Sequence, residues 1–380
     1  MAHPRPAPLA LALIALAVGD AGCGRIGYDP LGDSGAGLVV TPGAATINLS
    51  STLTLTAAGG TPPYGFAVTA GAGTIDASSG RFVAPARVGT STVTVADAAG
   101  AVATATITHR GARLYLLGGQ RGGAAIDEVL ASDDGATWTR IGQLPEPRDS
   151  GAAVVWNDRI FYLGGMDATG ASRDTVWASA DGVAWSTVGT LINRVGSMGA
   201  AVHGDALWIA GGYEAGSYDQ VYRSDDGARW MLAGRLPSAR HEVELVSHAG
   251  ELYALGGHAD SGYLTDVVVS TDGATWTARG GGVTIAQDWA TAAWRGPQVL
   301  RTGGFGVGLE RSTDLVTWAP GAPLPGAPRE SPGMVDDGAR LLVVGGGVEV
   351  LATVDGSAWT TIGALPDARA RVAAVAFTPR

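Results

Sequence analysis

Arginines recur at corresponding places along the chain and are the residues most able to do chemistry. They follow Leu-Pro pairs or stand in similar segments, at Arg148, Arg194, Arg240, Arg329 and Arg369. All 25 basic residues are arginine, so Schiff-base chemistry and a P-loop lysine are excluded. A guanidinium binds carboxylate or sulfate through paired hydrogen bonds. The spacing therefore predicts either an anion-binding ring of arginines or a set that pairs with carbonyls and carboxylates of the fold itself.

Aromatic and acidic residues are further candidates for the same site. Tyr213 and His258 each follow a glycine pair, and Asp288 and Trp289 stand where the pattern would place another arginine. A repeat that departs from its own pattern is a place where a specific site can arise. The indole of Trp289 could stack on a sugar ring or fill a gap in the packing, and the sequence leaves both interpretations open.

A histidine and two carboxylates occur together at His241, Glu242 and Glu244. Side chains two apart on a strand share one face, so both carboxylates could line a channel. They could form an acid–base or cation site, or they could simply be solvated by water. The histidines show no metal-ligand spacing, so the sequence predicts no metal and no cofactor.

Composition limits the elements that can position these residues. The chain has 380 residues, of which 59 are Gly and 19 are Pro, so about one residue in five is a strong helix breaker. The formal net charge is −10, and no basic run exists that could bind phosphates. A helical bundle and a nucleic-acid partner are therefore excluded, and an all-β fold is expected.

The single cysteine lies shortly after an apolar run at residues 9–18. This run is too short to span a bilayer, and the four residues that end at Cys23 resemble the processing box of bacterial lipoproteins. The resemblance implies a signal peptide at 1–22, lipidation of Cys23 and an anchor at the outer membrane or cell surface. Cleavage after Ala21, which would give a periplasmic or secreted protein, is the alternative. Residues 23–37 predict a flexible tether.

Residues 38–109 alternate apolar and polar side chains in short β-branched runs. This alternation predicts half-buried strands. With its Gly-Gly-Thr-Pro-Pro-Tyr stretch at 59–64, the segment resembles bacterial immunoglobulin-like domains. The resemblance implies a small β-sandwich that acts as a spacer or, alternatively, as a binding module.

A repeat with a period in the forties fills residues 110–380. In each copy an apolar run ends at a glycine pair, and a tryptophan follows. Six copies with several short strands each predict a β-propeller with one four-stranded blade per copy. The pairs begin at Gly118, Gly164, Gly211, Gly256, Gly303 and Gly345, and the tryptophans are Trp138, Trp185, Trp230, Trp276, Trp318 and Trp359.

An Asp-Gly pair precedes the tryptophan in most copies, as at Asp134 and Gly135. Such a pair predicts a tight turn between two strands, because glycine accepts a positive φ at no steric cost. The fifth copy has Leu315 where glycine is expected, so we expect a different turn there.

Taken together, these features resemble the kelch repeat, which combines an apolar strand, a glycine pair, a later tryptophan and a Leu-Pro-x-x-Arg loop. The resemblance implies a six-bladed propeller whose ligands bind the arginine-bearing face, over the central channel. Residues 372–377 repeat the innermost strand of a blade with no blade to follow. We therefore expect this C-terminal strand to complete the first blade.

The sequence predicts a monomeric, exported, non-enzymatic binding or scaffold protein that recognises a glycan or a protein at this face. The alternative is a carbohydrate-active enzyme of sialidase or sialic-acid mutarotase type. A sialidase needs an arginine triad, a tyrosine–glutamate pair and an acid, but no Phe-Arg-Ile-Pro or Tyr-Arg-Ile-Pro segment stands near the first copy.

Overall fold

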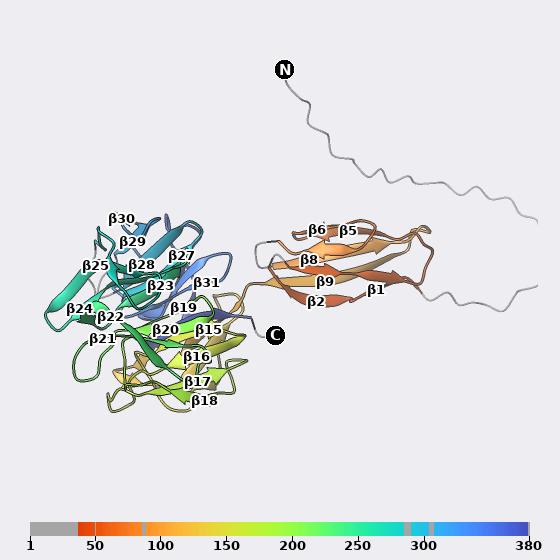
Figure 1. The fold of residues 1–380 in the computed structure, drawn as a ribbon. Coiled ribbons are helices and arrows are strands. Elements are labelled where there is room, and N and C mark those ends of the chain that lie inside the picture. The colour runs from red at the N-terminus through yellow and green to blue at the C-terminus, as the bar shows by residue number, and fades with distance from the viewer. Residues whose placement is uncertain (1–36, 50, 86–88, 285–289, 304–307, 379–380) are drawn as a thin grey trace, which may run out of the picture.

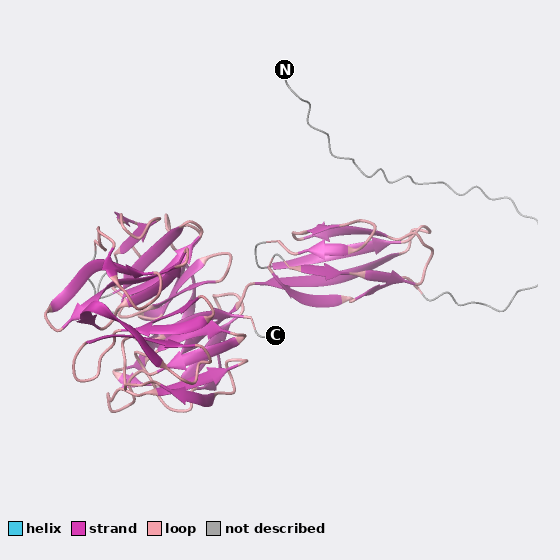
Figure 2. Ribbon diagram, in the orientation of Figure 1, coloured by secondary structure: helices cyan, strands magenta, loops and turns pink. Residues whose placement is uncertain are grey.

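The computed structural model describes residues 37–49, 51–85, 89–284, 290–303 and 308–378. Within these ranges every helix or strand found is a β-strand, so the fold is all-β as predicted (Figure 2). Accordingly, this part of the chain offers no helix with the length and apolar character needed to cross a membrane.

The N-terminal strands form a unit of their own (Figure 1). It contains one sheet in the order β2-β9-β8-β5 and smaller sheets β3-β7-β6 and β1-β4, and β2 pairs with β9 in parallel. Val40, Phe66, Phe82 and Ile107 come from these three sheets and share one buried core. The expected strands are present, and the immunoglobulin-like topology stays a prediction. The strands are β1 (Val39–Thr41), β2 (Ala44–Asn48), β3 (Thr52–Thr54), β4 (Thr56–Ala58), β5 (Gly65–Ala70), β6 (Thr74–Ile75), β7 (Arg81–Val83), β8 (Gly89–Ala96) and β9 (Val102–Arg110).

Six antiparallel four-stranded sheets follow in the described part of the chain after residue 112. The first combines β10 (Arg113–Leu117), β13 (Glu128–Ser132) and β14 (Thr139–Gln143) with the C-terminal β35 (Ala373–Phe377), and each later sheet takes four consecutive strands. This arrangement is consistent with the blades of a β-propeller.

The remaining strands are a ribbon of β11 (Gln120–Arg121) and β12 (Ala124–Ala125), then, sheet by sheet, β15 (Ala152–Trp156), β16 (Arg159–Leu163), β17 (Thr175–Ser179) and β18 (Ser186–Thr190); β19 (Gly199–His203), β20 (Ala206–Ala210), β21 (Tyr218–Ser224) and β22 (Met231–Arg240); β23 (Glu244–His248), β24 (Glu251–Ala259), β25 (Gly262–Ser270) and β26 (Thr277–Ala278); β27 (Ala290–Arg295), β28 (Gln298–Gly303), β29 (Leu309–Ser312) and β30 (Ala319–Pro320); and β31 (Gly333–Asp336), β32 (Leu341–Val344), β33 (Gly347–Thr353) and β34 (Thr360–Arg369).

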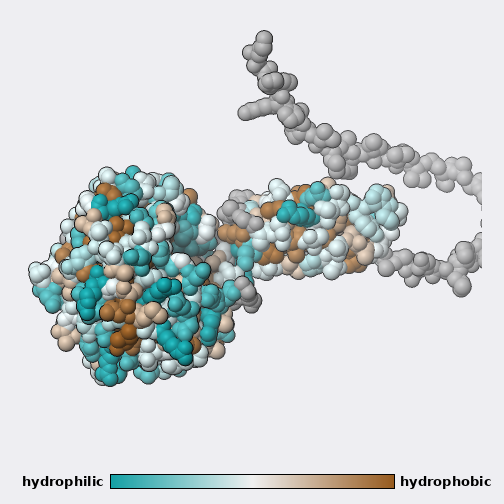
Figure 3. Space-filling view, in the orientation of Figure 1, coloured by the Kyte–Doolittle hydropathy of each residue, from teal (hydrophilic) through white to brown (hydrophobic). Residues whose placement is uncertain are grey.

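Neighbouring sheets share buried apolar cores. Between the sixth and first sheets, for example, Leu342 and Val350 pack with Leu114, Leu116 and Trp138. The innermost strands contact one another in the cyclic order β35-β15-β19-β23-β27-β31-β35. The six sheets therefore surround a central channel. Outside these cores, the hydrophobic patches visible on the six-sheet unit are small and separated by hydrophilic residues (Figure 3).

The glycine pairs set the direction of the backbone where the second strand of a sheet ends. Gly118 and Gly119 have φ values of 57° and 97°, a region that favours glycine. The Gly119 amide donates to the carbonyl of Arg148 at 2.8 Å, and a Cβ on Gly118 would lie 2.4 Å from that same oxygen. This contact places the glycine pairs and the arginine loops at the same end of the ring.

The Asp-Gly turns lie at the other end. Asp134 Oδ1 accepts hydrogen bonds from the amides of Ala136 and Thr137 at 2.8 and 2.7 Å. The Gly135 amide donates to Ser132 Oγ at 2.8 Å, so both turn residues are held by side chains of the turn itself.

The expectation of a different turn at Leu315 was wrong. Leu315 adopts a φ of 61°, and its amide donates to Ser312 Oγ at 2.8 Å, as glycine does in the other sheets. Asp314 Oδ1 also keeps its two amide partners. The Leu315 side chain is buried in the core that contains Trp318, and this packing offsets the cost of a left-handed conformation.

Candidate functional site

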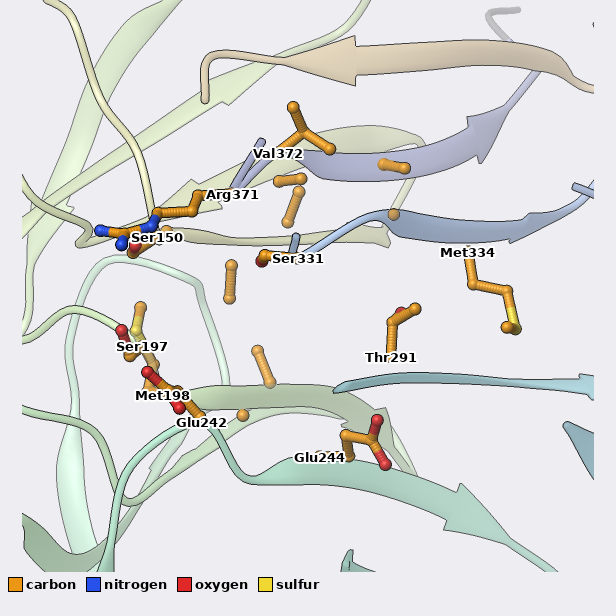
Figure 4. Close-up of a pocket in the computed structure, with 18 of the residues that line it drawn as sticks. Ser150, Ser197, Met198, Glu242, Glu244, Thr291, Ser331, Met334, Arg371 and Val372 are labelled. Atoms are coloured by element: carbon orange, nitrogen blue, oxygen red, sulfur yellow. The ribbon is translucent and has the colours of Figure 1, made fainter. Parts of the chain in front are cut away.

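The innermost strands begin around the mouth of the channel, where a cavity of about 260 Å³ opens (Figure 4). Residues with positive φ precede these strands and are linked by their main chains. The amide of Ser150 donates to the Arg371 carbonyl, Ser197 to Ser150, Glu242 to Ser197, and Arg371 to Ser331. These hydrogen bonds, 2.6 to 3.2 Å long, hold the strand starts at the mouth in fixed positions.

Four of the predicted ligand arginines are buried in the framework instead of facing the mouth. The exposed fractions of Arg148, Arg240, Arg329 and Arg369 are 1%, 0%, 3% and 2%. Each reaches from the end of one sheet to the third strand of the next. Buried guanidinium groups with protein partners leave little surface for a ligand, so these arginines belong to the alternative in which they pair with the fold.

The partners of these arginines differ from sheet to sheet. Arg240 binds both oxygens of Asp266 at 2.8 and 2.9 Å, and Arg369 binds Glu128 at 3.0 Å. Arg329 donates to the carbonyls of Gly345 and Glu349. Arg148 donates to Thr175 Oγ1 and lies over Trp177. Because Arg369 ends the sixth sheet and Glu128 lies in the first, this pair joins the two ends of the ring.

Arg194 does not occupy the equivalent position. Val195 does, because its carbonyl accepts the Gly165 amide at 2.9 Å, as the Arg148 carbonyl accepts that of Gly119. Arg194 lies one residue earlier and is exposed. This loop lacks the proline found in the other loops. The sequence comparison therefore took Arg194 as the equivalent residue, one position before Val195.

The framework role predicts that Arg240→Ala lowers the free energy of unfolding by about 2 to 4 kcal/mol, because a buried bidentate pair and a carbonyl contact are lost. Arg194→Ala should change it by less than about 0.5 kcal/mol, as expected for an exposed side chain. Urea unfolding of both variants measures this difference. Equal stability of the two variants would contradict the framework role.

An unbroken row of rings lies beside the mouth. The centroids of Tyr213 and His241 are 5.0 Å apart, those of His241 and His258 are 4.9 Å apart, and those of His258 and Tyr263 are 5.0 Å apart. His241 and His258 also exchange main-chain hydrogen bonds of 2.9 and 2.8 Å. The structure thus brings together the predicted residues Tyr213 and His258 through His241. Tyr263, which is 52% exposed, extends the row and had no sequence signal.

Ser217 and Asp260 orient the central histidine. Ser217 Oγ donates to Asp260 Oδ1 at 2.7 Å, because a carboxylate can only accept. His241 Nδ1 lies 2.9 Å from the same hydroxyl and must donate to it. The hydrogen bond from Ser217 lowers the pKa of Asp260. The other imidazole nitrogen then faces Glu242, whose Oε1 is 4.0 Å away.

Three ionisable side chains form a buried network that begins at Glu244, which lines the cavity, and continues to the second and third strands of the fifth sheet. Arg301 Nε lies 2.8 Å from Glu244 Oε2, and Arg301 Nη1 lies 2.6 Å from Glu310 Oε1. The exposed fractions of Glu244, Arg301 and Glu310 are 8%, 1% and 0%. Burial raises the pKa of Glu244 to about 7, although the attraction of Arg301 opposes the shift. Glu244 can therefore gain or lose a proton near neutral pH.

The other sheets show that the ring does not need these three ionisable residues. The strand pairing that joins Arg301 to Glu310 joins two apolar residues in each other sheet. These pairs are Leu116 with Leu130, Tyr162 with Trp177, Ile209 with Tyr222, Ala254 with Val268 and Val343 with Leu351. The positions that correspond to Glu244 hold Ala152, Gly199, Thr291, Gly333 and Ala373.

The charge at the mouth differs from the positive field expected of an arginine ring. Carboxylates stand at Glu214, Glu242 and Asp260, while Arg371 lines the cavity and pairs with Glu330 at 3.3 Å. Asp288, Trp289 and Cys23 lie outside the described residues. Among the described residues no group of three potential ligands could hold a metal ion. The described mouth therefore suits a ligand that donates hydrogen bonds.

Comparison with known proteins places the fold in a class of solved structures. One member of this class is the structure of YjhT. It matches with a TM-score of 0.53 and 12% sequence identity, over 62% of this chain and 89% of that one. This likeness concerns the fold alone. No family model matches the chain. No curated protein matches it at a significant level.

Proposed function

We propose that the chain is an exported, lipid-anchored binding protein whose six-sheet ring, a kelch-like propeller, binds a glycan beside the channel mouth. The row formed by Tyr213, His241, His258 and Tyr263 carries this proposal. Ring faces pack on the apolar faces of sugars, and the carboxylates of Glu214 and Asp260 nearby can accept hydrogen bonds from hydroxyl groups.

The placement of the arginines favours binding over catalysis of the sialidase type. Such an enzyme needs three arginines that converge on a substrate carboxylate, whereas Arg148, Arg240 and Arg329 are buried in different sheets with protein partners. A protein ligand at the same face is the other outcome that a binding screen can give.

The sequence supplies the rest of the proposal. Cys23 would carry the lipid anchor, residues 23–37 would act as the tether, and residues 38–109 would be an immunoglobulin-like spacer that holds a monomeric propeller away from the outer membrane or cell surface. Release of the mature protein into the periplasm or medium is the alternative location.

We expect the double variant Tyr213→Ala/His258→Ala to bind its glycan at least about tenfold more weakly than the parent, because two of the four rings are removed. A glycan array with the full chain identifies the ligand, and calorimetry then compares the variants. His248→Ala is a matched control. Its ring also stacks on an aromatic ring, that of Trp294 at 3.7 Å, but the pair lies at the opposite ends of β23 and β27.

Equal affinity in the double variant and in His248→Ala would reject the ring row as the binding site. Binding to no glycan, together with capture of a defined protein through the same residues, would replace the glycan by a protein ligand.

One observation favours a second candidate function, a carbohydrate-active enzyme of sialic-acid mutarotase type. Glu244 has a pKa raised to about 7, and a general acid or base works best when its pKa lies near the working pH. Exchange of sialic-acid anomers that is accelerated by the chain and lost in Glu244→Gln would favour this alternative over binding alone.

A further inference from the structure

Glu244 lines the cavity at the channel mouth, and one of its carboxylate oxygens has no hydrogen-bond donor among the described residues. Arg301 engages Oε2, whereas Oε1 is buried and has no hydrogen-bond partner among the described residues. In Figure 4 the Glu244 carboxylate lies at the cavity together with Thr291. A buried acceptor without a donor costs about 1 to 3 kcal/mol, so the site is built for a donor that the described residues do not supply.

The charges around this oxygen have a clear sign. Glu244 and Glu310 oppose Arg301, which leaves the buried network with a formal charge of −1. Towards the mouth, Glu242 adds a carboxylate, and Arg371 is already paired with Glu330. Taking a carboxylate out of water costs several kcal/mol. A proton or a cation that binds at Oε1 removes this cost.

We propose that this cavity binds a primary ammonium group, with Glu244 Oε1 as its acceptor. An ammonium supplies a hydrogen-bond donor for Oε1 and a positive charge together. The chain has no lysine, so none of its own side chains can supply this group. If the glycan-binding function proposed above holds, on which this identification rests, the group belongs to an amino sugar.

The network of Glu244, Arg301 and Glu310 is not needed to hold the ring of sheets together. Each of the other sheets joins two apolar residues at the positions of Arg301 and Glu310, and buried ion pairs rarely stabilise a fold more than apolar residues do. The buried Arg301–Glu310 pair occurs only in the sheet next to the inner strand that carries Glu244. Its function is therefore to hold Glu244 in place and to set its charge.

Protons compete with the ammonium group for Glu244. The charged groups that act on Glu244 are Arg301 on β28 and Glu310 on β29, and Glu242 and Arg371 also line the cavity. With a pKa of about 7, Glu244 is mostly protonated at pH 6 and ionised at pH 8, while an alkylammonium stays charged at both. Binding should therefore strengthen about tenfold from pH 6 to pH 8.

The test is ligand-observed NMR of n-propylammonium with the full chain, with n-propanol and tetramethylammonium as probes that lack the charge or the N–H donors. We expect saturable binding of n-propylammonium alone, about tenfold tighter at pH 8 than at pH 6. Glu244→Gln should abolish it, and Glu251→Gln, at the opposite end of the neighbouring strand, should not. Equal binding of n-propanol, or binding retained in Glu244→Gln, would overturn the proposal.

A second variant guards against loss of folding in Glu244→Gln. Glu244→Ala/Arg301→Val/Glu310→Leu copies the residues of the other sheets and should be folded yet unable to bind n-propylammonium. Failure of the glycan screen with n-propylammonium binding intact would reject only the glycan function. Glycan binding without any preference for n-propylammonium would reject only the ammonium site.

Discussion

Arg301→Leu should lower the free energy of unfolding by about 3 to 5 kcal/mol at pH 8, because it removes one partner from a buried ion network. Glu244 and Glu310 would then remain as two carboxylates with almost no exposure and without the guanidinium of Arg301. Urea unfolding followed by tryptophan fluorescence gives the midpoint and the slope from which this loss is obtained.

The triple variant Glu244→Ala/Arg301→Val/Glu310→Leu should recover that loss and unfold within about 1 kcal/mol of the parent, because apolar residues of suitable volume replace buried ion networks at little cost. Comparing the stabilities of the two variants shows whether the charged residues are needed for folding. A triple variant as unstable as Arg301→Leu would show that the ring itself depends on the charged residues.

Deleting residues 372–380 should prevent stable folding of the six-sheet ring. Val372, Val375 and Phe377 are at least nine-tenths buried, and burying three such side chains contributes about 5 to 9 kcal/mol. The deletion also removes the five-residue pairing of β35 with β10. Since a domain is stable by only about 5 to 15 kcal/mol in total, little stability remains.

The deletion is measured by near-ultraviolet circular dichroism and thermal melting. Removal of residues 379–380 alone is the control, and it should leave the melting curve unchanged. A synthetic peptide with the sequence of residues 370–380 should restore part of the signal of the shortened chain. A cooperative transition at the parent temperature after the full deletion would contradict closure by β35.

The ring of sheets could be predicted because its determinants are local and repeated. The pair at Gly118 must be glycine, since a Cβ would collide with the carbonyl of the next arginine loop, and the same collision recurs at Gly164 and Gly211. The C-terminal run at 372–377 had no partner within its own copy, which left only the first sheet for it. Because the same local pattern is repeated in each copy, the arrangement of all six sheets could be predicted from it.

The site could be predicted only in part, because it depends on contacts between copies. Tyr213 and His258 were named from their place after glycine pairs, but only the ring brings them together through His241. The partner of a buried arginine depends on the group that the next sheet presents, such as Asp266 for Arg240. Sequence spacing alone does not locate that partner.

The charged residues of the fifth sheet had a visible signal. Arg301 and Glu310 stand opposite each other at strand positions that hold apolar residues in the other sheets. Their connection to Glu244 could not be inferred, because that residue lies 57 positions before Arg301 and meets it only between two neighbouring sheets. A charge at a strand position that is apolar in every other copy is therefore the feature to look for.

The most direct test of the proposed binding face is hydrogen–deuterium exchange at the histidine ring carbons, measured by mass spectrometry with and without the best glycan from the array. We predict that the glycan slows exchange at His241 and His258 and leaves His248 unchanged. Unchanged exchange at His241 and His258 in a chain saturated with glycan, or equal slowing at His248, would contradict binding beside the channel mouth.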